Sequence, residues 1–147
     1  MTATNAQAAF RECFGGPRAL IGVLHVGALP GTPSASHSID TLIRQTLAEA
    51  RVYRDAGFAA LVIENMHDRP YLNRAVGPEV TAAMTAIGRE VRREVALPLG
   101  VQVLAGANRE ALAVALNWLA VGRRGKKVFA ANVVRESFAS AEVVNPL

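Results

Sequence analysis

The sequence predicts an α/β fold in which three consecutive βα units form a parallel sheet. Short apolar runs alternate with segments of helical periodicity three times between residues 19 and 119. The runs are apolar at successive positions, which is typical of strands buried on both faces of a parallel sheet. Hydrophobic residues make up 51% of the 147 residues, so the chain can bury a sizeable core.

The first unit follows a small-residue-rich segment, residues 1–18, which we expect to be a loose leader. Residues 19–26 are apolar up to His25 and predict a buried strand. The loop that follows contains Gly and Pro residues that interrupt both strands and helices. A helix is predicted for residues 39–56, with Ser38 as its N-cap.

The second and third units repeat this pattern. The second has a strand at residues 59–65, a long loop, and a helix that starts at Pro78, a residue favoured in the first helical turn. In the third unit, a strand at residues 99–104 precedes a helix that is capped near Asn108 and runs through Leu119.

Two architectures accommodate three such units, because βα units in series require right-handed crossovers and a parallel sheet. One is an open doubly wound sheet and the other a (β/α)8 TIM barrel. An open sheet of three or four strands would be small for its class. We therefore slightly favour an incomplete barrel, since a whole one needs about 250 residues.

The charge pattern changes near residue 117. Residues 1–116 contain 11 Arg, no Lys and 10 acidic residues, whereas residues 117–147 contain 3 Arg, 2 Lys and 2 acidic residues. The only tryptophan, Trp118, also lies in the second segment. Residues 117–147 are therefore either a basic, solvated tail or a segment that did not evolve with the rest of the chain.

The candidate functional residues follow the predicted strands, because ligands bind at the carboxyl ends of parallel strands in both architectures. Glu64 lies in an apolar run, and a buried carboxylate needs a partner or a ligand. Glu64 and His25 are therefore the acid/base candidates. Four further residues are candidates for substrate binding: Asn65, His67, Asp68 and Gln102.

Structural roles remain open for several of these residues. His25 could be a hydrogen-bonded core histidine, Asn65 could simply end its strand, and His67 and Asp68 could stabilise their loop. A metal site formed by His25, Glu64, His67 and Asp68 is an alternative, but an adjacent His and Asp are not a specific signal. The metal and the cofactor are therefore left as unknown.

Several classes of protein are disfavoured by the sequence. The apolar runs are too short for a transmembrane helix, and the single cysteine, Cys13, cannot form an internal disulfide. Nucleotide-binding and hydrolase signatures such as GxGxxG, GxxxxGK[ST] and GxSxG do not occur. The basic cluster at residues 123–127 has no aromatic stacking platform, so we expect a small-molecule ligand rather than specific nucleic-acid binding.

Four segments resemble, in the same order, motifs of the BtpA/SgcQ family. They are residues 21–33, 61–71, 76–85 and 99–116. The resemblance covers residues 19–116 and is greatest to animal members described as mitochondrial. It implies a TIM barrel of the ribulose-phosphate-binding type and an intracellular protein, either cytoplasmic or mitochondrial. The strand-end residues that the family shares would fall on four positions: His25, Glu64, Asn65 and Asp68.

The resemblance implies two classes of function. One is an enzyme that acts on a small sugar-like or phosphorylated compound. The other is a non-catalytic assembly or stability factor for a membrane-associated complex, since the cyanobacterial member is linked to photosystem I. Of these two classes we favour the enzyme.

The resemblance ends at residue 116, where the charge pattern changes. We therefore expect residues 19–116 to be the N-terminal part of a barrel and residues 117–147 a divergent tail. This would be a truncated product of alternative splicing or a frameshift, without full activity. Residues 128–134 could pair as a makeshift fourth strand. The outer strands would lack neighbours, and their unpaired edges could mediate a homo-oligomer.

Overall fold

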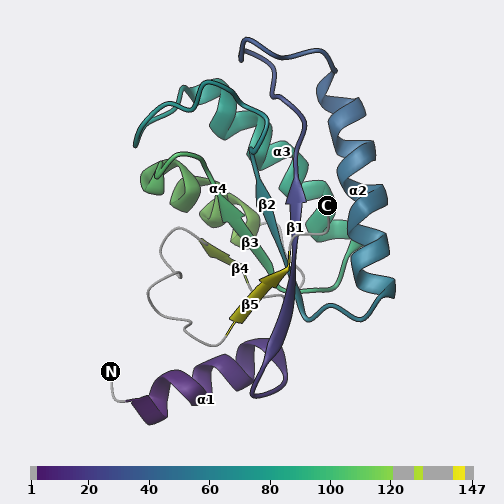
Figure 1. The fold of residues 1–147 in the computed structure, drawn as a ribbon, viewed down its shortest axis with the longest axis vertical. Helices are drawn as coiled ribbons and strands as arrows, with labels where there is room; N and C mark the ends of the chain where they lie inside the picture. Colours follow the sequence, from purple (N-terminus) through teal and green to yellow (C-terminus); the bar gives the residue numbers. More distant parts are fainter. Residues whose placement is uncertain (1–2, 121–127, 131–140, 145–147) are drawn as a thin grey trace.

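The computed structural model describes residues 3–120, 128–130 and 141–144 (Figure 1). Three consecutive βα units occupy its centre, as the sequence predicts. The elements are, in order, α1 Ala3–Phe14, β1 Ala19–His25, α2 Ile39–Asp55, β2 Ala60–Glu64, α3 Pro78–Glu94, β3 Leu99–Gln102, α4 Asn108–Ala120, β4 Val128–Ala130 and β5 Ala141–Val144.

The strands form one parallel sheet in the order β4-β3-β2-β1-β5. The prediction of an α/β fold with a parallel sheet is therefore confirmed. The described strands form an open sheet rather than a closed barrel. In the register of the central strands, Val23 pairs with Val62 and Val62 pairs with Gly100.

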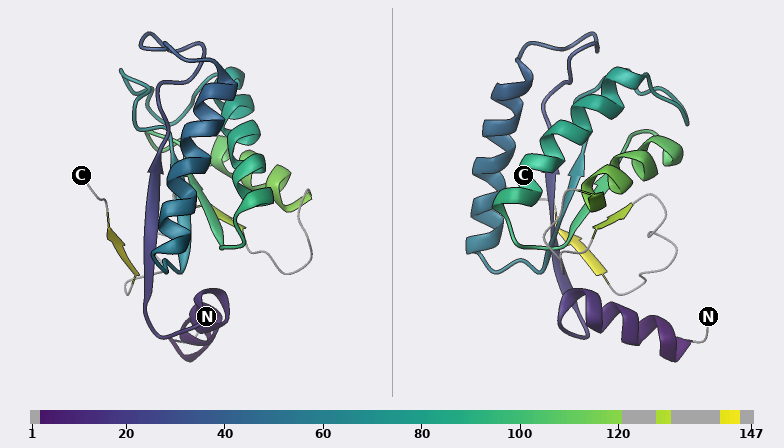
Figure 2. Two further views of the ribbon diagram at one scale, coloured as in Figure 1. Left: turned by 90° about the vertical axis from the view of Figure 1, so that its right-hand side faces the viewer. Right: turned by 180° about the vertical axis from the view of Figure 1, so that it is seen from behind.

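One face of the sheet is covered by α2, α3 and α4, which lie on the same side of the strands (Figure 2). Most strand side chains on this face are buried in a single apolar cluster with the three helices, whereas Leu20 at the start of β1 is 40% exposed. This cluster includes Leu24, Leu61, Ile63, Leu99 and Val101. Alternate residues of a strand point to opposite faces, so the remaining strand residues lie on the other side.

The contact between α3 and α4 is organised around Trp118. Its side chain is completely buried, and its indole N–H donates a hydrogen bond to the Thr85 carbonyl at 3.1 Å. Gly88 leaves room for the ring, since a methyl group at that position would overlap it. The boundary predicted at residue 117 therefore falls inside α4, and Trp118 is a core residue.

Helix α1 lies at the amino-terminal ends of the strands (Figure 1) and packs against residues of the opposite face of the sheet. Phe10 is buried with Ile21 of β1 and Val62 of β2. Its ring lies 4.8 Å from that of Phe14, one helical turn later. The prediction of a loose leader is wrong for residues 3–14. These residues form a helix, and its two aromatic rings pack against the sheet.

The sequence also predicts that the strand near residues 19–26 or the one near residues 99–104 lacks a neighbour on one side, but both have neighbours on both sides. The sheet continues beyond β3 with β4 and beyond β1 with β5, each in parallel. The prediction that β1 or β3 would lack a neighbour is therefore wrong. A strand within residues 128–134 is confirmed for residues 128–130; the remainder of this segment and the basic cluster at residues 123–127 lie outside the described residues.

The third strand is shorter than predicted. It ends at Gln102 instead of at residue 104, because the Leu104 N–H donates to the Asn65 side chain rather than to a neighbouring strand. Among the described residues, no helix is long and apolar enough to cross a membrane.

Candidate functional site

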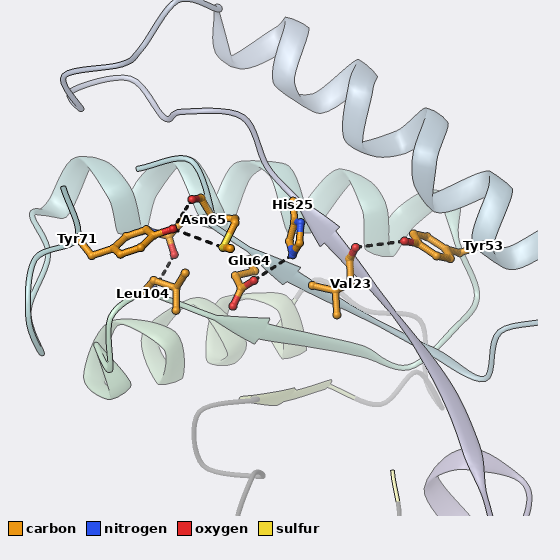
Figure 3. Close-up of polar contacts among 8 residues, drawn as sticks. Val23, His25, Tyr53, Glu64, Asn65, Tyr71 and Leu104 are labelled. Carbon is orange, nitrogen blue, oxygen red and sulfur yellow. Dashed lines mark hydrogen bonds and ion pairs between the residues drawn. The ribbon is translucent and has the colours of Figure 1, made fainter. Parts of the chain in front are cut away.

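Three candidate residues lie side by side across the carboxyl ends of the central strands. In the parallel register His25 of β1 pairs with Glu64 of β2, and Glu64 pairs with Gln102 of β3. Side chains alternate between the two faces along a strand, and His25 and Glu64 lie an even number of residues after Ile21 and Val62 in their strands. They and Gln102, which pairs with Glu64, therefore lie on the face opposite α2–α4. A row of an imidazole, a carboxylate and a carboxamide therefore occupies this end of the sheet, and Figure 3 shows its first two members, His25 and Glu64.

His25 and Glu64 interact directly. The distance from His25 Nε2 to Glu64 Oε2 is 3.2 Å, and the two side chains are 23% and 12% exposed. Burial raises the pKa of Glu64, and the neighbouring imidazole partly opposes this increase. A carboxyl group with a raised pKa beside an imidazole is a suitable pair for proton transfer near neutral pH.

A second carboxylate near His25 belongs to Glu49 of α2. Burial raises the pKa of Glu49, and the charge of His25 opposes the increase. Glu49 is not among the site residues that the sequence predicts. Helical spacing could have identified Glu49, since it lies one turn before Tyr53 and therefore on the same side of the predicted helix. Tyr53 is buried against β1, where its hydroxyl donates to the Val23 carbonyl at 3.4 Å.

Asn65 and Asp68 hold three βα loops together. Asn65 Nδ2 donates to Asp68 Oδ2 at 2.9 Å, and Asn65 Oδ1 accepts from the Leu104 N–H at 2.7 Å. Asp68 Oδ1 accepts from the Leu29 N–H at 2.8 Å. Both side chains are buried. These contacts give Asn65 and Asp68 a structural role in the loops that surround the site.

His67 lies apart from this buried pair. It is exposed in the loop after β2 and lines a cavity of about 600 Å³ together with His25. The structure thus brings His25, Glu64 and Gln102 together in one row and places His67 at the cavity next to them. Asn65 and Asp68 lie beneath the loops instead.

The alternative metal site is not assembled in this conformation. Within the described ranges, no group of three or more His, Cys, Asp or Glu side chains is arranged to hold a metal ion. His25 and Glu64 are in contact, whereas the Asp68 carboxylate faces the amides of Leu29 and Asn65.

The fold and the site together define an α/β protein with polar groups at the carboxyl ends of parallel strands. The sequence model of the BtpA family matches residues 17–143. The chain therefore belongs to the BtpA family, as the sequence motifs indicate. The match includes residues on both sides of position 117, whereas the similarities to individual relatives are shorter.

Three relatives illustrate the range of the family. An uncharacterized protein of Pyrococcus horikoshii is 44% identical over 85 residues, which are 58% of this chain and 32% of the relative. An uncharacterized mitochondrial protein of Caenorhabditis elegans is 40% identical over 102 residues, 65% of this chain and 36% of the relative. The photosystem I biogenesis protein BtpA of Synechocystis is 31% identical over 96 residues, 65% of this chain and 33% of the relative.

The chain spans about a third of the length of these curated relatives. No solved structure is significantly similar to it.

Proposed function

We propose that the BtpA-family protein to which this segment corresponds is an enzyme that acts on a small sugar-like or phosphorylated compound. The observation that carries this proposal is the contact between His25 and Glu64 at the carboxyl end of the sheet. In parallel α/β folds this end is where ligands bind.

The proposed catalytic group is Glu64. Its raised pKa favours a protonated carboxyl group at a higher pH than an exposed glutamate would, so it can donate a proton and then take one back. Once Glu64 has given its proton to the substrate, His25 can supply a replacement proton to the carboxylate across the 3.2 Å contact. Gln102, next in the row, is placed to hold a substrate hydroxyl through its carboxamide.

The proposed scaffold is a (β/α)8 barrel, with β1–β3 as part of its wall. Three right-handed βα units in a parallel sheet support this assignment, together with the polar row on the face opposite the helices. On this scaffold the row faces the interior, and Asn65 and Asp68 are positioning residues that fix the loops around it.

The test begins with ligand binding by this chain. A panel of sugars, sugar acids and sugar phosphates is screened by thermal unfolding, where a bound compound raises Tm by several degrees at a concentration well above its Kd. The Glu64→Gln variant is expected to retain the fold. Turnover of the compound is then measured by NMR in a full-length relative and in its variant at the position aligned with Glu64.

The expected result is a decrease in turnover of roughly 10²- to 10⁴-fold in that variant, which is the usual contribution of a general acid or base. The matched control is Glu90→Gln at the corresponding position, since Glu90 is a partly exposed partner of Arg93 on α3. Turnover that stays within a factor of three after the substitution at the Glu64 position would contradict the proposal.

A second candidate function is a non-catalytic assembly or stability factor for a membrane-associated complex. It is supported by the name of the Synechocystis relative, a photosystem I biogenesis protein. Under this alternative, the protein co-purifies with a membrane complex, and Glu64→Gln leaves the accumulation of that complex unchanged. Under the enzymatic proposal, the same substitution abolishes the biological effect.

A further inference from the structure

All three histidines of the chain line the cavity beside His25. Its volume is about 600 Å³, and it is formed by the loop after β1, the start of α2 and the loop after β2. The lining residues are His25, Gly27, Ala28, Ser34, Ser36, His37, Gln45, His67 and Arg69. The sequence contains no further histidine.

The lining of this cavity is rich in hydrogen-bond donors and contains no carboxylate. Among the described residues, no ion pair joins Arg69, His37 or His67 to an acidic side chain. By contrast, His25, which also lines the cavity, contacts Glu64 and lies near Glu49. Among the described residues, Arg69 therefore forms no ion pair with a protein carboxylate.

The loop contacts fix where His67 and Arg69 lie. His67 and Arg69 are the immediate neighbours of Asp68, whose carboxylate is bound to the Leu29 N–H and to Asn65. The Arg69 N–H also donates to the His67 carbonyl at 2.9 Å. The contacts that join the first two loops thus present His67 and Arg69 on the side of the loop containing His37.

We propose that this cavity binds the anionic group, phosphate or carboxylate, of a small-molecule ligand. Arg69 supplies a guanidinium fork, and His37 and His67 supply imidazole N–H donors, which together suit the oxygens of such a group. The serine hydroxyls in the lining donate further hydrogen bonds. The reacting part of the ligand then lies over His25 and Glu64.

This inference gives the substrate class for the site described under the proposed function and rests on it for the placement of the reacting part. Anion binding itself needs no turnover. It also differs from the common arrangement in TIM barrels, where a phosphate is held by the loops after strands seven and eight. Here the donors come from the loops after β1 and β2.

The three histidines allow a direct test by NMR. The imidazole C2 proton signals of the chain are assigned with single His→Gln variants and are followed while inorganic phosphate or acetate is added to protein that has been freed of metal ions on a chelating resin. The pH and ionic strength are held constant. We expect saturable shifts of the His37 and His67 signals with at least one of these anions.

Two arginine variants locate the binding site. Arg69→Gln is expected to weaken anion binding roughly tenfold, the effect of losing one charge-assisted contact. Arg54→Gln is the matched control, because Arg54 is exposed near the end of α2 away from the cavity and pairs with Asp55. This control should leave the affinity unchanged. Arg69→Lys keeps the charge but loses the fork and should have an intermediate effect.

Signals that change linearly without saturation, or an equal affinity in the two Arg→Gln variants, would overturn the inference. Should Arg69→Gln not fold, as judged by circular dichroism, the titrations of the unsubstituted chain and of Arg69→Lys decide. The proposed function is tested separately through Glu64 and turnover, so either proposal can fail while the other stands.

Discussion

The two faces of the central sheet differ in chemistry although they belong to the same three strands. The face toward α2–α4 is apolar along its whole length, and Leu24, Leu61 and Ile63 are completely buried there. The opposite face is apolar only at its amino-terminal end, under Phe10. Its carboxyl-terminal end carries the row of His25, Glu64 and Gln102.

This difference separates the residues that stabilise the fold from those available for chemistry. A side chain in the helix-covered cluster contributes through close packing, and its loss costs free energy of unfolding. A half-buried carboxylate such as Glu64 contributes unfavourably, because its charged form is poorly solvated. We therefore expect opposite signs when the two faces are substituted.

The largest expected effect is that of Trp118→Ala on the helix-covered side. The Trp118 indole is completely buried and occupies the space left by the absent side chain of Gly88. Its removal should lower the free energy of unfolding by about 3–5 kcal/mol. The measurement is urea unfolding followed by far-ultraviolet circular dichroism, since the substitution removes the only tryptophan fluorophore.

The matched control lies on the same helix. Leu116 is 65% exposed, so Leu116→Ala should change the free energy of unfolding by less than about 0.5 kcal/mol. Equal effects of the two substitutions would show that α4 is not packed against α3 as described.

The helix-covered side was also the more predictable one. The helix predicted for residues 39–56 is observed as Ile39–Asp55, with the Ser38 side chain accepting from the Thr41 N–H. The predicted start at Pro78 is also observed. These features depend on residues close in sequence, namely caps and a repeated apolar face, which local patterns reveal.

The second expected effect concerns the loops at the carboxyl end of the sheet. Asn65→Ala removes the acceptor of the Leu104 N–H and the donor to Asp68, leaving buried polar groups without these partners. We expect a loss of about 2–3 kcal/mol in the free energy of unfolding, measured by urea titration.

Asn117→Ala is the control for this substitution. Asn117 is exposed and makes one hydrogen bond, from its Nδ2 to the Ala113 carbonyl within α4. Its loss should cost less than about 0.5 kcal/mol. A comparable cost for Asn65→Ala would indicate that the Asn65–Asp68 contacts do not hold the loops.

The contacts of Asn65 and Asp68 between these loops could not be predicted from the sequence, because their backbone partners are distant in the sequence. Leu29 and Leu104 each lie 39 residues from the side chain that they contact. The sequence placed His25, Glu64 and Gln102 at strand ends, but only the register shows that they are neighbours. The helix α1 was missed because its apolar face is small and consists mainly of Phe10 and Phe14.

The smallest expected effect, and the one with the opposite sign, is that of Glu64→Gln. The folded-state pKa of Glu64 is raised above its ordinary value of 4.5, so the fold favours the protonated carboxyl group. This contribution is fully present below the unfolded-state pKa and is lost as the pH rises through the folded-state pKa. Gln resembles the protonated carboxyl group at every pH.

The difference in stability between Glu64→Gln and the unsubstituted chain should therefore be small at pH 4. It should increase in favour of the variant above pH 4.5 and then level off, because burial outweighs the attraction of His25 in setting this pKa. Urea unfolding of both proteins at intervals from pH 4 to pH 8 measures this difference, and Glu90→Gln serves as the control at a more exposed glutamate. A variant that is less stable than the unsubstituted chain at pH 7 would mean that the attraction between Glu64 and His25 exceeds the cost of burying the carboxylate. The polar end of the sheet would then stabilise the fold, as the helix-covered apolar face does.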